Sequence, residues 1–452
     1  MKKIFQYIML AVVTIVMASC TSDIEETTVT TGKSNVQLVV GEFPVFGDSQ
    51  TRAIGTPDEG KTSWAEGDEL LLEMTSKTLG TKYAAFKYNG SSWELASGEL
   101  SYKEDEVPTF PHVYYAPNYK WEAGKLVLKE GKAAGTDEYI EGKANITPNG
   151  QGINVSFTDA TRNYSRLRIA TMPNKQITVD TEYFTPAGSS DMEQNGNYTL
   201  TSDEKGNAYL YGTFENNSEV TVKYREAALT TYTFSQATES AKSYALDATV
   251  ISANSAEEIK SAIEQEVANS KTAIILNLAS DAGDNEFNAI REAFKNVQDA
   301  TIDLTLIGCK EIPADGLKEL KALKSIFLPD VTKIGMNALS RCVYLEEICA
   351  PNVSTIDERA FAGFIMLEKV TLGELTDVRG EANSGGGIFD DDNWTPYIDL
   401  YLPKNQEVMK GEFDENSNQY IWKPTGEKYF ASPDYDNGIF LGYQFNSVKS
   451  WE

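Results

Sequence analysis

The chain has 452 residues, of which 41% are hydrophobic and 24% are charged, and its formal net charge is −27. This hydrophobic content is sufficient for packed cores and argues against a largely disordered chain, while the length predicts two to three domains. A folded body this acidic repels phosphate backbones and anionic lipid headgroups, which excludes nucleic acid as a partner and limits membrane contact to an anchor.

The first 19 residues have the composition of a secretory signal peptide. Two lysines precede an uncharged apolar run from Ile8 to Met17, and small residues follow it. The run is too short to span a bilayer comfortably. The stretch VMASC (16–20) resembles a bacterial lipobox, which implies cleavage before Cys20 and lipidation of that residue. Ordinary secretion is the alternative.

Residues 20–35 are acidic and rich in threonine, which predicts a flexible tether. Acidic residues directly after the lipidated cysteine resemble the surface-export signal of Bacteroidetes lipoproteins. The resemblance implies a lipid-anchored protein of the cell outer membrane that is exposed on the cell surface. Acyl chains would then hold the protein at the membrane without a transmembrane helix.

Residues 36–250 contain many short apolar–polar alternations separated by turn residues, and they show no marked helical period. Leu70, Leu72 and Met74 illustrate the alternation, and Asn89-Gly90 between two aromatic segments predicts a hairpin. This pattern predicts an all-β sandwich region with two subdomains that meet near residues 120–150.

The same region contains TRAIGTPDEGKTSWAEGDELLLEM (51–74), the NG-SSW hairpin and VYYAP (113–117), which resemble the fimbrillin-like (Mfa-like) domain of Bacteroidetes surface lipoproteins. The resemblance fades beyond residue 160. It implies transthyretin-like sandwiches, proteolytic processing after Arg52, and a groove that accepts a donor strand from another fimbrial subunit. An ordinary exposed loop arginine is the alternative for Arg52.

The second half contains three units that align without gaps at a spacing of 22 residues. A period in the twenties with a Leu-x-x-Leu-x-Leu core predicts a leucine-rich-repeat solenoid, in which equivalent side chains stack from coil to coil. Prolines 329 and 351 would end the strands, and MNALSRC (336–342) and ERAFAGF (358–364) predict short helical returns. The aligned apolar positions are Leu323, Ile326, Leu328, Val331 and Ile334, then Leu345, Ile348, Ala350, Val353 and Ile356, and then Leu367, Val370, Leu372, Leu375 and Val378.

This repeat resembles the BspA-type leucine-rich repeat of bacterial surface proteins over roughly residues 300–378. At its N-terminal end, Ser255 and Glu258 predict a capping box before a helix, followed by a strand at 273–280 and a helix at 285–297. YIDLYLP (397–403) repeats the strand-then-proline pattern, and GIFLGYQF (438–445) predicts part of a C-terminal cap. The predicted fold is therefore multidomain, with N-terminal all-β transthyretin-like sandwiches and a C-terminal α/β leucine-rich-repeat solenoid at 251–452.

Residues with catalytic potential are scarce. His112 is the only histidine and lies in an apolar strand segment, which excludes His-dependent triads and zinc sites with several histidines. SGGG (384–387) lacks the lysine and helix of a phosphate loop. The acidic groups 390–392 and 434–436 could hold calcium, but neither fits the EF-hand pattern, and solvated loops are the simpler interpretation. We therefore predict no enzymatic activity, no cofactor and no metal.

The cysteines other than Cys20 show no metal-binding spacing. A disulfide between two of Cys309, Cys342 and Cys349 is conceivable on an outer surface, but Cys309 and Cys342 are predicted to be buried as small apolar side chains.

The outward column of the predicted solenoid strands is the candidate binding face, with a merely solvated sheet face as the alternative. Its aromatic residue between polar neighbours favours recognition. The predicted function is a fimbria-associated or stand-alone surface adhesin that binds a protein or glycan on a host or bacterial surface. The alternative is a carbohydrate-capture accessory protein or a hydrolase with an acidic-loop calcium or sugar site. The candidate face consists of Asp303, Thr305, Ser325, Phe327, Glu347, Cys349, Lys369 and Thr371.

Overall fold

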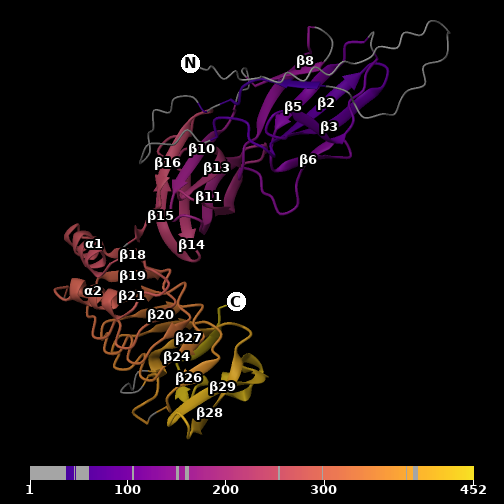
Figure 1. The fold of residues 1–452 in the computed structure, drawn as a ribbon. Coiled ribbons are helices and arrows are strands. Elements are labelled where there is room, and N and C mark those ends of the chain that lie inside the picture. Colours follow the sequence, from indigo (N-terminus) through magenta and orange to yellow (C-terminus); the bar gives the residue numbers. More distant parts are fainter. Residues whose placement is uncertain are drawn as a thin grey trace, which may run out of the picture.

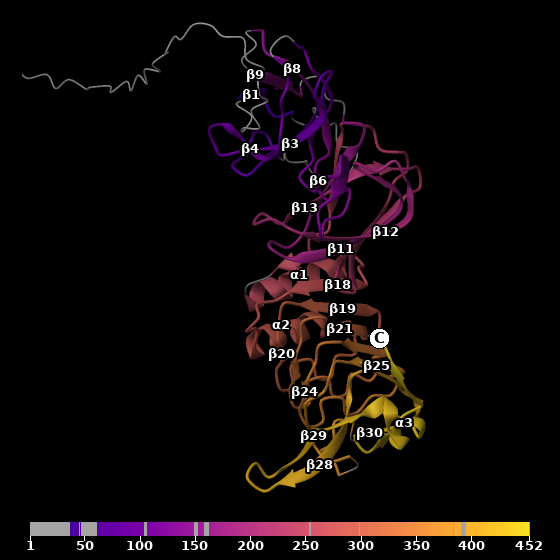
Figure 2. The ribbon, with the colours of Figure 1, turned by 90° about the vertical axis from the view of Figure 1, so that its right-hand side faces the viewer.

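The computed structural model is rich in β-strands, and its sheets form three bodies that follow one another in chain order (Figures 1 and 2). The predictions for the signal peptide, the tether, Cys20, Arg52 and residues 390–392 lie outside the described residues. The structure describes residues 37–44, 46, 61–103, 106–148, 152–157, 162–252, 255–297, 299–382, 384–389 and 395–451.

The first body is a curled sheet with the strand order β1-β9-β8-β5-β2-β3-β4 in the described part of the chain. β1 pairs in parallel with β9, and every other neighbouring pair is antiparallel. β1 and β4, the two ends of this path, also contact each other, so the sheet encloses one core. The strands are β1 Gln37–Val40, β2 Glu69–Ser76, β3 Gly80–Tyr88, β4 Trp93–Gly98, β5 Thr109–Tyr115, β8 Ile140–Ile146 and β9 Gly152–Ser156, with a separate hairpin of β6 Tyr119–Glu122 and β7 Lys125–Leu128.

The sequence alternation in this body places side chains as predicted. Leu70, Leu72 and Met74 of β2 are buried in the core of the curled sheet. The predicted hairpin joins β3 to β4, and the side chain of Asn89 accepts the N–H groups of Ser91 and Ser92 in its turn. An amide side chain that satisfies turn N–H groups fixes the reversal locally, which explains why the sequence signal was readable.

The second body has the order β15-β14-β11-β13-β10-β16, and β12 pairs with β11. β8 and β9 belong to the first sheet, and β10 is the first strand of the second sheet. Division into domains at these points remains a prediction. The strands are β10 Ser165–Ala170, β11 Gln176–Pro186, β12 Glu193–Thr201, β13 Asn207–Phe214, β14 Glu219–Tyr224, β15 Ala227–Thr233 and β16 Ser243–Asp247.

The segment after β1 ties the first two bodies together. The Arg162 guanidinium donates to the carbonyl oxygen of Pro44 at 2.6 Å and pairs with the buried Glu138 carboxylate at 3.1 Å. The ring of Phe46 lies 4.1 Å from the Arg162 guanidinium and 4.7 Å from that of Arg166. A desolvated guanidinium is attracted to the face of an aromatic ring, so this short segment helps to hold the two sheets together.

The third body is a stack of coils that winds through two ladders of strands. The first ladder is entirely parallel, with the order β17-β18-β19-β21-β23-β25-β27-β32. The second is β20-β22-β24-β26, continued by the antiparallel pair β29-β28. The strands are β17 Ile251–Ser252, β18 Ala273–Asn277, β19 Ile302–Ile307, β20 Glu311–Ile312, β21 Leu323–Phe327, β22 Lys333–Ile334, β23 Glu347–Ala350, β24 Thr355–Ile356, β25 Lys369–Leu372, β26 Asp377–Arg379, β27 Asp399–Leu402, β28 Glu407–Asp414, β29 Gln419–Lys428 and β32 Ser447–Ser450.

The strand register reproduces the 22-residue spacing of the sequence. Ile326 pairs with Ile348, which pairs with Val370, and all three side chains are buried. Each coil therefore places its aliphatic residues directly against those of the next coil. The buried residues form one continuous core that extends through the whole stack.

Each coil also has a segment outside the two strand ladders, and there the structure differs from the sequence prediction. The predicted helical returns at 336–342 and 358–364 are turns, so the α/β description of the solenoid was wrong for the repeat itself. Leu317 N donates to Ala338 O at 2.8 Å, and Leu339 N donates to Ala360 O at 2.9 Å, which joins successive coils. Backbone groups bonded to a neighbouring coil are not free for bonds along a helix. Left-handed residues recur every 22 positions on this side, at Asp315, Asn337 and Arg359.

Both ends of the stack are covered. At the N-terminal end, α1 Ala256–Ala268 and α2 Asp284–Phe294 bury Ile259, Ile263 and Phe287 against the first coils. The Ser255 hydroxyl accepts the N–H of Glu258 at 3.3 Å, as predicted for this helix start. Phe440 and Tyr443 pack at the C-terminal end. The remaining elements there are η1 Thr395–Tyr397, η2 Tyr429–Ala431, α3 Pro433–Asp436, β30 Ile439–Phe440 and β31 Tyr443–Gln444.

Candidate binding surface

The structure brings the eight residues of the predicted face together in two rows across the parallel ladder. One row runs through Asp303, Ser325, Glu347 and Lys369, and the other runs through Thr305, Phe327, Cys349 and Thr371. Of these eight, Asp303 and Lys369 are exposed, and Thr371 is only 9% exposed. Most of these side chains are less accessible than an alternating strand pattern suggests, and the role of the face in binding stays a prediction.

Polar groups on this face bind one another. The Ser325 hydroxyl donates to Asp303 at 2.6 Å, and the Lys369 ammonium lies 2.7 Å from Glu347, which raises the pKa of Lys369. In the next coils, Asp399 accepts the Ser447 hydroxyl at 2.6 Å, and this bond lowers the pKa of Asp399. A face whose charges are already paired offers few groups for a ligand.

The N-terminal part of the stack contacts the second body. Met172 and Tyr224 pack with Ile307 in one buried cluster. Asp330, which is 3% exposed, accepts the Tyr224 hydroxyl at 3.2 Å and lies 3.0 Å from the Arg225 guanidinium. Burial, and then the charge of Asp330, raise the pKa of Tyr224. The second body therefore packs beside the predicted recognition face, on residues that are not among its eight.

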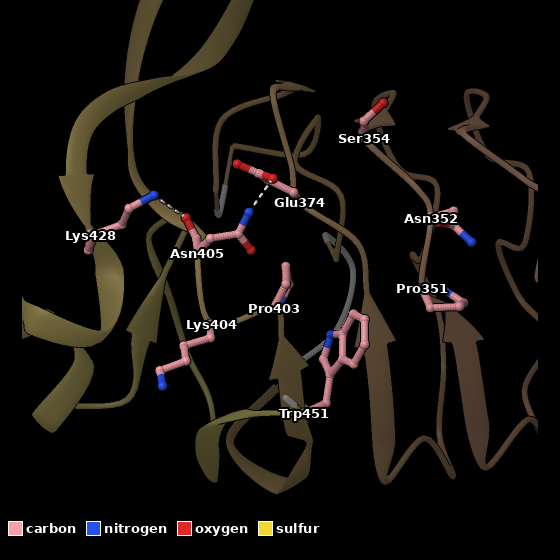
Figure 3. Close-up of a pocket in the computed structure, with 9 residues that line it drawn as sticks. All are labelled: Pro351, Asn352, Ser354, Glu374, Pro403, Lys404, Asn405, Lys428 and Trp451. Carbon is pink, nitrogen blue, oxygen red and sulfur yellow. Dashed lines mark hydrogen bonds between the residues drawn. The ribbon is translucent and has the colours of Figure 1, made fainter. Parts of the chain in front are cut away.

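A groove along one edge of the parallel ladder, in the C-terminal half of the stack, was not predicted from the sequence. It has a volume of about 770 Å³ and lies beyond the carboxyl ends of β23, β25, β27 and β32 (Figure 3). Parallel strands present their carboxyl ends at one edge, so residues that are distant in sequence meet there. The groove is lined by Pro351, Asn352, Ser354, Glu374, Pro403, Lys404, Asn405, Lys428 and Trp451.

Hydrogen bonds hold several groove side chains in place. The Trp451 indole N–H donates to the carbonyl oxygen of Leu372 at 3.0 Å, and the residue remains 37% exposed. The Asn405 amide donates to Glu374 at 2.5 Å, and Lys428 donates to the Asn405 carbonyl at 2.8 Å (Figure 3). The groove therefore combines a fixed aromatic ring with amide, carboxylate and ammonium groups.

The remaining candidates that lie within the described residues form no second site. His112 is exposed on β5, where its Nδ1 lies 3.0 Å from Glu141 and 2.9 Å from the Tyr114 hydroxyl. Asp434 and Asp436 are exposed on α3, and among the described residues no group of three His, Cys, Asp or Glu is arranged to hold a metal. Ser384 lies in a turn, where its hydroxyl donates to Glu381 O.

The three cysteines of the described chain are free thiols. Cys309 and Cys342 are buried, as predicted, and burial raises the pKa of each thiol to about 12. Burial also raises the pKa of Cys349, to about 11. Because the thiolate is the nucleophile, these shifts make all three groups poorly reactive at neutral pH.

Within the described part of the chain, no helix combines the length and the apolar character that a bilayer crossing requires.

No known protein family and no curated protein matches this chain. A solved structure from Bacteroides fragilis NCTC 9343, a "putative cell adhesion protein", is similar at 11% identity over 48% of this chain and 92% of that chain, with a TM-score of 0.27. A TM-score this low does not establish a shared fold.

Proposed function

We propose that this protein is a lipid-anchored surface adhesin that presents one edge of its coil stack to a protein or glycan on a host or bacterial surface. The observation that carries the proposal is the open groove beyond the carboxyl ends of β23, β25, β27 and β32. It belongs to the coil stack, which is the body farthest from β1 (Figure 2). An anchor at Cys20, 17 positions before the start of β1, would place the coil stack outermost.

The arrangement of the bodies supports a rigid display role. The stack has one continuous core, and it is joined to the second body by a hydrophobic cluster and by the Arg225–Asp330 ion pair. We assign the stack to the leucine-rich-repeat class on the strength of its 22-residue register, and the first two bodies to fimbrillin-like, transthyretin-like sandwiches. The strand topology is compatible with both assignments.

Surface display and binding can be tested on cells that produce the full chain. We expect the wild-type protein to be membrane-bound and digested when intact cells are treated with a protease, and Cys20→Ala to be released from the membrane. The purified chain without its signal peptide should bind host or bacterial cells saturably. Protection from the protease, or the absence of saturable binding to every surface tested, would contradict the proposal.

Association with fimbriae is a second part of the proposal. β1 is an edge strand with the buried Leu38, and the segment that contains Arg52 follows it. Cleavage after Arg52 would leave β1 held by hydrogen bonds and packing alone, so that a donor strand of another subunit could replace it. Mild trypsin treatment and mass spectrometry should show this cleavage, followed by ladders of joined subunits. A folded chain that resists cutting there and stays monomeric would rule out donor-strand exchange.

The carbohydrate-capture alternative is favoured by the aromatic ring in the groove, whereas hydrolysis is not. A glycosidase requires two carboxyl groups on opposite sides of the scissile bond, about 5–9.5 Å apart. Glu374 is the one acidic residue among the described residues that line the groove, and it is bonded to Asn405. Capture of a sugar without turnover is therefore compatible with adhesion.

A further inference from the structure

We propose that the groove around Trp451 is a saccharide-binding site that contacts two or three units of a glycan chain from the side. This inference rests on the proposed function, because it names the ligand class that a surface adhesin would bind with this site. The groove volume of about 770 Å³ lies within the usual range for small-ligand sites.

The aromatic ring is positioned before any ligand arrives. The Trp451 indole N–H is held by Leu372 O, and its backbone N–H donates to Leu402 O at 3.2 Å. Pro351 and Pro403 lie on either side of the ring, so its neighbours are also stiff (Figure 3). A fixed, partly exposed ring can cover the apolar C–H face of a sugar, and little conformational entropy is lost on binding.

Polar groups surround the ring and retain unused hydrogen-bonding capacity. The Asn352 amide donates through Nδ2 to Pro329 O at 2.7 Å, and Asn405 donates through Nδ2 to Glu374. Among the described residues, neither side-chain Oδ1 accepts a hydrogen bond, and Lys404 has no bonded partner. Amide oxygens, a carboxylate and an ammonium together can satisfy the mixed donors and acceptors of sugar hydroxyls.

The spacing of these groups follows the strands. Asn352, Glu374 and Asn405 come from the ends of β23, β25 and β27, which are successive neighbours in the ladder. Neighbouring strands lie about 4.8 Å apart, which is comparable to the length of one hexose unit. A glycan that crosses the strand ends would therefore meet a polar side chain at each step.

The lining argues against other ligand classes. Two lysines and one glutamate do not make the strongly basic surface that a polyphosphate or nucleic acid requires. The polar rim would leave its donors and acceptors unpaired beneath an acyl chain, which is costly. A saccharide can pack its C–H face on the aromatic ring and pair its hydroxyl groups with the polar side chains around it.

The test uses the full chain without its signal peptide on an array of defined bacterial and mammalian glycans, followed by calorimetric titration of the bound ones. We expect Trp451→Ala to weaken binding at least tenfold and Lys404→Ala to weaken it severalfold. Phe413→Ala removes another exposed aromatic side chain outside the groove and should leave affinity within twofold of wild type. Circular dichroism checks that each variant is folded. If Trp451→Ala does not fold, the affinity of Lys404→Ala tests the site instead.

Glycan binding that persists unchanged in the groove variants would overturn the site. The absence of any bound glycan on the array would overturn the ligand class. If saturable binding to cells is nevertheless observed, the adhesin proposal stands and only this inference fails. If the chain binds neither glycans nor cells, both fail.

Discussion

Ile348 provides a quantitative test of how the stack is held together. Its side chain is 0% exposed, and it lies between Ile326 and Val370 in the register of the parallel ladder. Replacing it with alanine removes contacts with both neighbouring coils at once. Because the core is continuous, the rigid backbone ladder limits how far the neighbours can collapse into the space.

The magnitude follows from the atoms removed. Ile348→Ala deletes three buried carbons, which at about 0.8 kcal/mol each corresponds to a transfer free energy of about 2.4 kcal/mol. A cavity contribution adds to this, and measured core substitutions of this kind cost about 2–5 kcal/mol. We therefore expect the free energy of unfolding to fall by about 3–4 kcal/mol.

The assay is urea unfolding followed by circular dichroism, with Ile365→Ala as the matched control. Ile365 belongs to the same coil but is 50% exposed, so the identical substitution should cost less than about 1 kcal/mol. Equal effects of the two substitutions, or a loss below 1 kcal/mol for Ile348→Ala, would show that Ile348 does not pack between coils.

Two further predictions concern the link between bodies and the buried thiols. Arg225→Ala should separate the stack from the second body and split the calorimetric unfolding into two transitions, because Asp330 loses its nearest cation. Since the Arg225 side chain is 42% exposed, solvent screening limits the loss of stability to about 1–2 kcal/mol. A single unchanged transition would contradict the link. Cys342 should resist thiol reagents at pH 8 in the folded chain. Its pKa is raised to about 12 by burial, so the unfolded thiol ionises first and stability falls above about pH 9. When the pH is raised from 8 to 10, the free energy of unfolding measured in urea should fall by about 1.4 kcal/mol less in Cys342→Ala than in wild type. Equal falls in the two proteins would contradict the burial of this thiol.

The sequence predicted those features that depend on local or periodic patterns. Ile326, Ile348 and Val370 fall in register because one aliphatic position recurs every 22 residues, and the Asn89 hairpin was readable because its side chain fixes the turn. The returns were misread because Asn337 adopts a left-handed conformation and its neighbours bond to the next coil. The residue pattern of a single coil does not show whether its backbone N–H groups bond within a helix or to the next coil.

The candidate site depended on contacts between distant parts of the chain, which a one-dimensional pattern does not contain. The side chains of the predicted face bond across the ladder, as Ser325 does with Asp303 and Lys369 with Glu347, so the accessibility of the face was overestimated. The groove needs Trp451 at the end of the last strand of the ladder and Lys428 at the end of a hairpin. The one sequence signal that could have indicated the groove was Trp451, a tryptophan that directly follows a strand of the ladder.

The central claim is that a coil of 22 residues is the unit from which the binding platform is built. The most direct measurement is the urea midpoint of a chain in which residues 345–366 are duplicated after Met366, compared with one in which only residues 345–364 are duplicated. The 22-residue copy should stack between its neighbours and unfold cooperatively near the wild-type midpoint, whereas the 20-residue copy shifts the register by two positions and should be strongly destabilised. Equal destabilisation by both insertions would contradict the claim.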